Sequence, residues 1–234
     1  MLRQAIRTLI NKFGYDLVKP DERLVINGLP ADFDKDVVDT YKKVKPFTMT
    51  TPERIAALCG AVKYLTENKI EGDFVECGVW RGGSTMAAID TLLKAGDKSR
   101  EIFLFDTYEG MSEPTEHDKV LTGAAADELM RTTDKEDPTS VWCYSTIDEV
   151  QKNVGSLNYP AGKVHFVKGK VEDSIPQTLP GKIALLRLDT DWYESTAHEL
   201  KHLYPLLVPG GVIIIDDYGH WEGARKAVDE YIAA

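Results

Sequence analysis

The chain has 234 residues, of which 38 are acidic and 28 are basic, giving a formal net charge of −10. Hydrophobic residues make up 43% and charged residues 28%, a composition typical of a globular protein with one sizeable core. These values exclude a wholly disordered chain, a collagen-like repeat and a coiled coil. The acidic excess also argues against a nucleic-acid partner, and no apolar run is long enough to cross a membrane.

Residues 1–50 are expected to form an N-terminal helical segment in front of the main domain. Within it, residues 2–13 carry an apolar stripe at helical spacing, with three basic residues off the stripe. Such a helix either makes peripheral contact with an anionic membrane or packs against the protein body or a second subunit of a homo-oligomer. Three cations are few for membrane binding, which favours packing against protein.

Residues 51–234 alternate short apolar strands with helices. This alternation predicts a doubly wound α/β domain with a mostly parallel sheet covered on both faces. A first helix is expected from Thr51, a plausible N-cap, and Pro52 fits its first position. Strands are expected at 73–79, 101–107, 164–169, 182–190 and 212–218, and further helices at 82–96, 145–157, 191–207 and 222–234.

One connection is longer than this fold requires. Between the second and third strands, residues 107–144 precede the helix expected at 145–157 and are rich in Thr, Asp, Glu and Gly. A long segment that leaves the carboxyl end of a strand lies beside the ligand crevice of doubly wound folds. We therefore expect a lid that moves when ligands bind, the alternative being a disordered insertion without a role.

The three cysteines are Cys59, Cys77 and Cys143. Their number is odd, and their spacing suits neither a zinc knuckle nor a small disulfide framework. The N-terminus also lacks the continuous apolar stretch and cleavage site of a signal peptide. We therefore expect reduced thiols and a cytoplasmic protein.

Acidic and small residues follow the first three strands, where folds of this type bind ligands. They are Glu76, Gly78 and Ser84 after the first strand, Asp106 at the end of the second and Asp173 after the third. The glycine spacing differs from a nicotinamide-binding fingerprint, and an acid inside the turn would repel a pyrophosphate. The acid suits a ligand with an amine or a sulfonium, and Asp106 can accept hydrogen bonds from both hydroxyls of a ribose. Together Glu76 and Asp106 indicate S-adenosylmethionine, the alternative being a capping or loop role.

Further aspartates end the last two strands. Asp189, Asp216 and Asp217 would converge if those strands are neighbours, and three carboxylates suit Mg²⁺, Mn²⁺ or Ca²⁺ rather than zinc. Asp191 follows closely and would be left free as a general base. The alternative is that Asp216 and Asp217 only cap the helix that follows.

The segment `HELKH` matches the zinc motif H-E-x-x-H, with His198 and His202 one helical turn apart. A zinc protease would also need a third ligand beside this helix. The two histidines lie off the apolar stripe that should cover the sheet, so we expect an ordinary helix surface here.

Five separated motifs resemble the macrocin O-methyltransferase family, in the right order: `FVECGVWRGGST`, `LFDTYEGM`, `LLRLDTDWYEST`, `LVPGGVIIIDDYG` and `GARKAVDEY`. The resemblance runs from about Thr48 to Tyr231. It implies a class I, Rossmann-like methyltransferase that uses S-adenosylmethionine and Mg²⁺ to methylate a hydroxyl of a sugar or glycosylated natural product. It also implies roles for particular residues: metal ligands at Asp189, Asp216 and Asp217, a base at Asp191, cofactor contacts at Glu76, Gly78, Ser84, Asp106 and Asp173, and a substrate contact at His220.

Class I methyltransferases usually end in an antiparallel pair of strands, whereas this chain stops at Ala234, at or just after its last helix. We therefore expect the fifth strand to lie at an edge of the sheet. The alternative functions are a catechol-type O-methyltransferase of small molecules, a nicotinamide-dependent oxidoreductase and a non-catalytic cofactor-binding protein.

Overall fold

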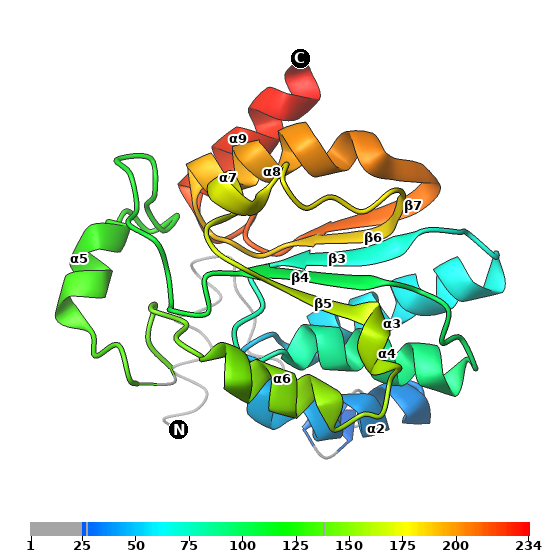
Figure 1. The fold of residues 1–234 in the computed structure, drawn as a ribbon. Coiled ribbons are helices and arrows are strands. Elements are labelled where there is room, and N and C mark those ends of the chain that lie inside the picture. Colours follow the sequence, from blue (N-terminus) through cyan, green and yellow to red (C-terminus); the bar gives the residue numbers. More distant parts are fainter. Residues whose placement is uncertain (1–24, 27, 138) are drawn as a thin grey trace, which may run out of the picture.

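A five-stranded parallel sheet forms the centre of the molecule, which a computed structural model describes for residues 25, 26, 28–137 and 139–234. The strand order is β5-β4-β3-β6-β7 (Figure 1). The strands are β3 (Asp73–Cys77), β4 (Ile102–Asp106), β5 (Val164–Lys168), β6 (Ile183–Leu188) and β7 (Leu207–Ile215). The doubly wound α/β architecture expected from the sequence is confirmed, because all four strand pairings are parallel.

Helices cover both faces of the sheet (Figure 1). One layer contains α2 (Lys35–Val44), α3 (Pro52–Glu67), α4 (Gly83–Lys94) and α6 (Ile147–Gly155). The other contains α7 (Val171–Ser174), α8 (Tyr193–Leu203) and α9 (Glu222–Ala233). Central strand β6 is buried along its whole length, so its continuous apolar run reflects burial on both faces. Among the described residues, no helix is long and apolar enough to span a membrane.

The predicted helix boundaries follow local signals in the sequence. Thr51 caps α3 by accepting a hydrogen bond from the backbone N–H of Arg54 at 3.4 Å, and Pro52 occupies the first turn. Thr146 caps α6 in the same way. Gly96 ends the α4 region with φ of +75°, a conformation that glycine adopts without strain.

Three features of the chain differ from the expected elements or lie outside the described residues. The fifth strand begins at Leu207 rather than at residue 212, and its pairing with β6 shifts register between Ile183 and Leu185. This strand tolerates Pro209 because it lies at the sheet edge, as expected.

The N-terminal segment contains α2, packed against α3 and α4, and a short antiparallel pair, β1 (Val25–Ile26) and β2 (Leu29–Pro30). The expected helix over residues 2–13 lies outside the described residues.

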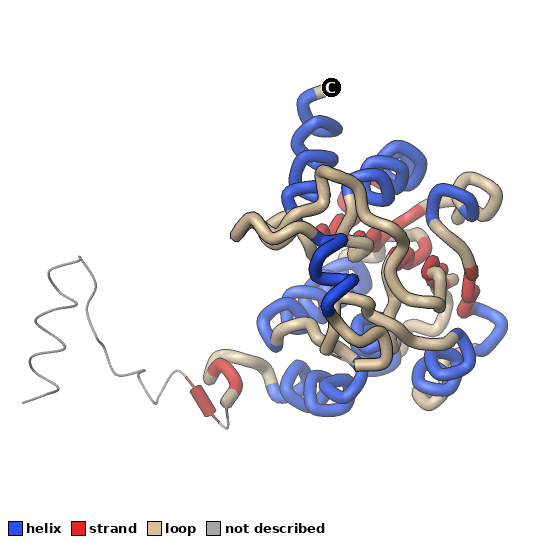
Figure 2. Tube along the Cα trace, turned by 90° about the vertical axis from the view of Figure 1, so that its left-hand side faces the viewer, coloured by secondary structure: helices blue, strands red, loops and turns tan. Residues whose placement is uncertain are grey.

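The excursion at residues 107–144 lies over the carboxyl edge of the sheet (Figure 2). It contains one helix, α5 (Ala126–Thr132), and a small apolar cluster shared with the body of the protein. That cluster joins Ala126 and Met130 to Trp192, Trp221 and Ala224, and the two indole rings meet edge to face at 4.9 Å. The described part of the excursion is therefore packed against the domain. Whether it moves stays a prediction.

Candidate active site

A cavity of about 520 Å³ opens at the carboxyl edge of the sheet, within the size range of small-molecule sites. Every strand-end loop contributes to its wall, together with ten residues of the excursion and residues 47–50 of the N-terminal segment. The predicted site residues that line it are Glu76, Gly78, Ser84, Asp106, Asp189, Asp191, Asp216, Asp217 and His220. Asp173 does not line it: this residue lies exposed on α7, whereas its neighbour Glu172 reaches the cavity.

Three aspartates gather at one end of the cavity. One carboxylate oxygen each from Asp189, Asp191 and Asp217 lies within 4.8 Å of the others. Strands β6 and β7 bring them together, since the backbone N–H of Asp216 donates to the carbonyl of Leu188 at 3.0 Å. Asp191 has a φ of +67°, an uncommon conformation for a non-glycine residue that turns the chain sharply after β6.

The surroundings of this cluster favour the protonated form of its carboxyl groups. Burial, together with smaller contributions from the charges of Asp189 and Asp216, raises the pKa of Asp191 to about 7. Burial likewise raises the pKa values of Asp189 and Asp217 well above their usual range, and neighbouring carboxylates add to this effect. A divalent cation would compensate these charges, and carboxylate oxygens are the donors that Mg²⁺, Mn²⁺ and Ca²⁺ prefer. The residues present therefore fit such an ion.

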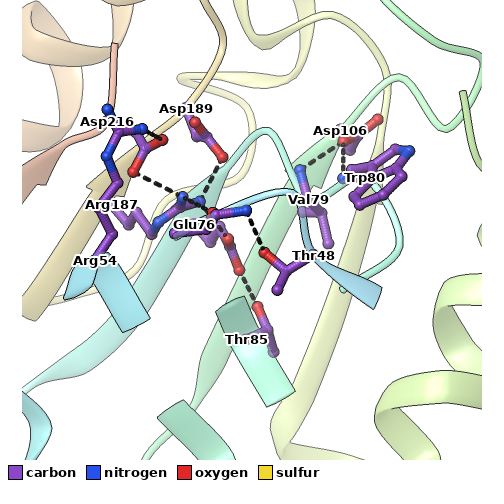
Figure 3. Close-up of polar contacts among 11 residues, drawn as sticks. Thr48, Arg54, Glu76, Val79, Trp80, Thr85, Asp106, Arg187, Asp189 and Asp216 are labelled. Atoms are coloured by element: carbon purple, nitrogen blue, oxygen red, sulfur yellow. Dashed lines mark hydrogen bonds and ion pairs between the residues drawn. The ribbon is translucent and has the colours of Figure 1, made fainter. Parts of the chain in front are cut away.

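The grouping differs from the predicted metal set, because Asp216 is not one of the three clustered carboxylates. Its carboxylate forms ion pairs with Arg54 at 2.8 Å and with Arg187 at 3.1 Å (Figure 3). The two guanidinium groups hold Asp216, and Asp191 is instead the third carboxylate of the cluster, beside Asp189 and Asp217. Neither Asp216 nor Asp217 caps α9, whose N-cap is Trp221, without a side-chain cap bond.

Arg187 is the positive charge at the centre of the site. It lies on β6 directly opposite Glu76 of β3 and is only 4% exposed. Its guanidinium pairs with Glu76 at 2.8 Å and with Asp189 at 2.6 Å, in addition to Asp216 (Figure 3). A guanidinium offers several donors in a fixed plane, so one side chain can serve three carboxylates from neighbouring strand ends. These ion pairs hold the three carboxylates, which line the cavity, in fixed positions.

Glu76 and Asp106 also line the cavity but are already hydrogen-bonded to the protein. Glu76 also accepts a hydrogen bond from the hydroxyl of Thr85, and burial raises its pKa. Asp106 accepts backbone N–H groups from Val79 at 2.6 Å and Trp80 at 3.1 Å, which fixes the turn between β3 and α4 (Figure 3). Gly78 in this turn has φ of +81°, and a side chain there would clash with the carbonyl of Asp189.

Sequence comparison places the chain among known proteins. A profile of the Macrocin-O-methyltransferase (TylF) family matches residues 17–234. The chain belongs to this family. It is therefore an S-adenosylmethionine-dependent O-methyltransferase, which decides against the oxidoreductase and the non-catalytic alternative.

Two relatives of this O-methyltransferase come from Streptomyces olivaceus and Micromonospora griseorubida. The 8-demethyl-8-(2,3-dimethoxy-alpha-L-rhamnosyl)-tetracenomycin-C 4'-O-methyltransferase of Streptomyces olivaceus is 33% identical over 215 residues, 91% of this chain and 77% of the relative. The mycinamicin III 3''-O-methyltransferase of Micromonospora griseorubida is 34% identical over 186 residues, 79% of this chain and 69% of the relative.

Solved structures show the same fold. The O-methyltransferase NovP has 32% sequence identity and a TM-score of 0.67, covering 80% of this chain and 74% of its own. CalS11, a calicheamicin methyltransferase, shares the fold at 16% identity with a TM-score of 0.57, covering 92% of this chain and 90% of its own. The class I methyltransferase fold expected from the motifs is therefore confirmed.

Several site residues of this methyltransferase were not predicted from the sequence. Arg187 had a signal, since it is the only charged residue in the apolar run `IALLRL`. Arg54 and residues 47–50 had none, because their part in the cavity depends on how the N-terminal segment packs. The `HELKH` histidines, by contrast, fulfil no metal pattern: His198 donates to the carbonyl of Ile175 at 2.7 Å, and no third ligand joins them in the described part of the chain.

Proposed function

We propose that this methyltransferase methylates a hydroxyl of a glycosylated small molecule with the help of a divalent cation, Mg²⁺ in particular. The observation that carries the proposal is the cluster of Asp189, Asp191 and Asp217, with oxygens within 4.8 Å of one another in the wall of the cavity. The relatives support the acceptor class, because the names of those from Streptomyces olivaceus and Micromonospora griseorubida specify methylation of glycosylated compounds.

The cofactor is proposed to occupy the end of the cavity lined by Glu76, Gly78, Ser84 and Asp106. S-adenosylmethionine supplies an electrophilic methyl group on a sulfonium and also carries an amine. The carboxylates of Glu76 and Asp106 favour a cationic ligand over an anionic one. Gly78 leaves the turn after β3 without a side chain, so that backbone and ligand can approach closely. Since Asp173 lies outside the cavity, its predicted cofactor contact is not part of the proposal.

The cation is proposed to lie between Asp189 and Asp217. Bound there, it would lower the pKa of an acceptor hydroxyl. The third protein ligand is either Asp191, which the observed geometry favours, or Asp216, which the family resemblance implies. In the second arrangement Asp216 must leave Arg54, and Asp191 remains free to take the proton from the acceptor.

In this second arrangement, Asp191 is proposed to remove the acceptor proton. Its pKa of about 7 is close to neutral pH, where a general base combines sufficient ionisation with sufficient basicity. Two buried indole rings, of Trp192 and Trp221, lie near it in the structure, and the side chain of Trp221 bonds to Asp191. His220 is exposed and lines the cavity, and its predicted contact with the acceptor is part of the proposal.

The acceptor class is tested by incubating the enzyme with methyl-labelled S-adenosylmethionine, Mg²⁺ and a panel of acceptors. The panel contains mycinamicin III, demethyldecarbamoylnovobiocin, the corresponding aglycones and a simple catechol. We expect label in glycosides only. Transfer to catechol or aglycones with none to glycosides would favour the catechol-type alternative.

The metal set is tested by Mn²⁺ binding, followed by electron paramagnetic resonance in Asp191→Asn and Asp216→Asn. If Asp191 is a ligand, its replacement weakens Mn²⁺ binding about tenfold or more, whereas Asp216→Asn changes it little. The reverse result would support the set implied by the resemblance, with Asp191 as a free base.

A reducing location is also proposed. All three cysteines are free thiols, two of them buried, as a cytoplasmic enzyme would have them. The homo-oligomer expected from the N-terminal segment remains a proposal that size-exclusion chromatography with light scattering tests.

A further inference from the structure

Part of the excursion is tied to both loops that carry the acidic cluster. The backbone N–H of Leu121 donates to the carbonyl of His220 at 3.0 Å, and that of Glu222 donates to the carbonyl of Lys119 at 2.8 Å. The indole N–H of Trp192 donates to the carbonyl of Ser112 at 3.0 Å. Residues 112–126 thus bond to the chain just after Asp191 and just after Asp217.

Asp118 lies at the centre of these contacts. It is 1% exposed, and its carboxylate accepts three hydrogen bonds. One oxygen accepts the backbone N–H of Tyr193 at 2.8 Å, and the other accepts the backbone N–H and hydroxyl of Thr115 at 2.6 and 2.9 Å. The backbone carbonyl of Asp118 also accepts the N–H of Ala126 at 2.9 Å, which closes the loop of the excursion around this residue.

The bond to Tyr193 caps helix α8 from outside the helix. Tyr193 is the first residue of α8, and its N-cap Trp192 makes no side-chain cap bond. The first N–H groups of a helix have no partner within it, and a carboxylate there also interacts favourably with the helix dipole. A residue that lies 75 positions earlier in the chain therefore does what a local N-cap does elsewhere.

Helix α9 reaches the same point. Gly223, in its first turn, lies so close to Asp118 that a side chain on the glycine would overlap the carboxylate oxygen. A Cβ there would also lie 3.0 Å from the backbone nitrogen of Tyr193. The excursion, the start of α8 and the start of α9 therefore meet at one buried carboxylate.

We propose that Asp118 is a positioning residue for methyl transfer: it fixes the start of α8 against the excursion and α9, and so holds Asp191 against Asp217. Asp191 lies two residues before Tyr193 and has a positive φ, a conformation that surrounding contacts must maintain. The inference rests on the proposed function, because it takes Asp191 and Asp217 to be residues of the reaction centre. It adds that the excursion determines how these two residues are placed.

The test uses variants that remove the bond from either side. Asp118→Asn keeps the size of the side chain, but its amide cannot accept bonds from both Tyr193 and Thr115. Tyr193→Pro removes the N–H of the first helical residue, where proline is tolerated, and with it the tyrosine ring; Trp192 already has the extended conformation that precedes proline. Tyr193→Ala is the matched control for loss of the ring, since it keeps the N–H. Asp127→Asn is the control for loss of an exposed acid on the same excursion.

Two readouts are measured on the full chain: amide hydrogen exchange over residues 189–196 and steady-state kinetics. Asp118→Asn and Tyr193→Pro should each accelerate exchange about tenfold or more and lower kcat about tenfold or more, with KM for S-adenosylmethionine changed less than about twofold. Tyr193→Ala should retain more activity than Tyr193→Pro, and Asp127→Asn should match the wild type. The double variant of Asp118→Asn and Tyr193→Pro should be no worse than the poorer single variant.

Several results would overturn the proposal. Unchanged hydrogen exchange in Asp118→Asn and Tyr193→Pro would show that the hydrogen bond between Asp118 and Tyr193 does not hold residues 189–196 in place. Faster hydrogen exchange with unchanged kcat would show that Asp118 has a structural role only. A fall in kcat of Tyr193→Pro that is no larger than the fall in Tyr193→Ala would lead to the same conclusion. If the wild type transferred no methyl group to any acceptor, the proposed function would fail by itself, and the exchange result would still show whether Asp118 holds the loop.

Discussion

Asp106 ends β4 with both carboxylate oxygens already bonded to backbone N–H groups, from Val79, Trp80 and Tyr108. The sequence predicted the position of this acid at the ligand crevice, but it could not show that the same carboxylate shapes the turn that faces the ligand. Loss of Asp106 should therefore weaken cofactor binding in two ways: by removing any direct contact with the ribose, and by releasing the turn between β3 and α4.

We expect Asp106→Ala to weaken binding of S-adenosylhomocysteine by about 1.5–3 kcal/mol, the range for a hydrogen bond to a charged group. Isothermal titration calorimetry measures this change. Asp173→Ala serves as the comparison, because Asp173 lies outside the cavity and should leave the affinity unchanged. Equal affinities for wild type and Asp106→Ala would refute the cofactor role of Asp106.

Single residues also show why the site was only partly predictable. The aspartates after β6 and β7 were found because parallel strands end at a common edge, and all of them line the cavity. Their partners were not found, because Arg54 reaches Asp216 from a helix 162 positions away in the sequence. Ion pairs of this kind depend on tertiary packing, which periodicity and turn residues do not encode.

At the scale of elements, local signals were sufficient to predict the existence and order of the five sheet strands and of the longer helices that flank them. Thr51, Thr146 and Gly96 mark helix ends by mechanisms that act within a few residues. The start of β7 was placed wrongly because Pro209 and two glycines are typical of a turn, whereas an edge strand accepts them. The excursion was recognised by its length alone, and its contacts with α8 and α9 had no signal.

These contacts divide the excursion into two parts. Residues 112–126 bond to the loops after β6 and β7, whereas the described backbone bonds of residues 139–143 stay within the excursion, for example from the N–H of Ser140 to the carbonyl of Asp137 and from the N–H of Met111 to the carbonyl of Trp142. We expect hydrogen exchange over 133–143 to slow about tenfold or more when S-adenosylhomocysteine and an acceptor bind, with little change over 112–126. Mass spectrometry of exchanged peptides measures this. Equal protection of 133–143 with and without ligands would refute a gating role for the excursion.

At the scale of the whole molecule, the acidic cluster should link stability to both pH and metal. The raised pKa values of Asp189, Asp191 and Asp217 mean that the folded state binds protons more tightly than the unfolded state. The stabilisation from these groups is therefore present at low pH and is lost as pH rises through the folded-state pKa values, which for Asp191 is about 7. A bound cation restores it, because it compensates the ionised carboxylates.

We therefore expect Mg²⁺ to raise Tm more at pH 8 than at pH 5. At a concentration one hundred times its Kd, the stabilisation is about 2.7 kcal/mol. Asp217→Asn should reduce the Mg²⁺ effect and, without metal, raise Tm at pH 8, since one of the repelling charges is gone. Scanning calorimetry at the two pH values measures both changes, and a Tm shift independent of pH and of Asp217 would show that the cation binds elsewhere.

The most direct test of the cation-dependent reaction is methyl transfer from labelled S-adenosylmethionine to a glycoside acceptor after chelation. Wild-type enzyme in excess EDTA should transfer no label, and added Mg²⁺ should restore transfer. Asp217→Asn should not regain activity with Mg²⁺, although it should still bind S-adenosylhomocysteine, since the cofactor is proposed to lie against β3 and β4. Full activity of the wild type in excess chelator, or of Asp217→Asn, would contradict a metal centre at these aspartates.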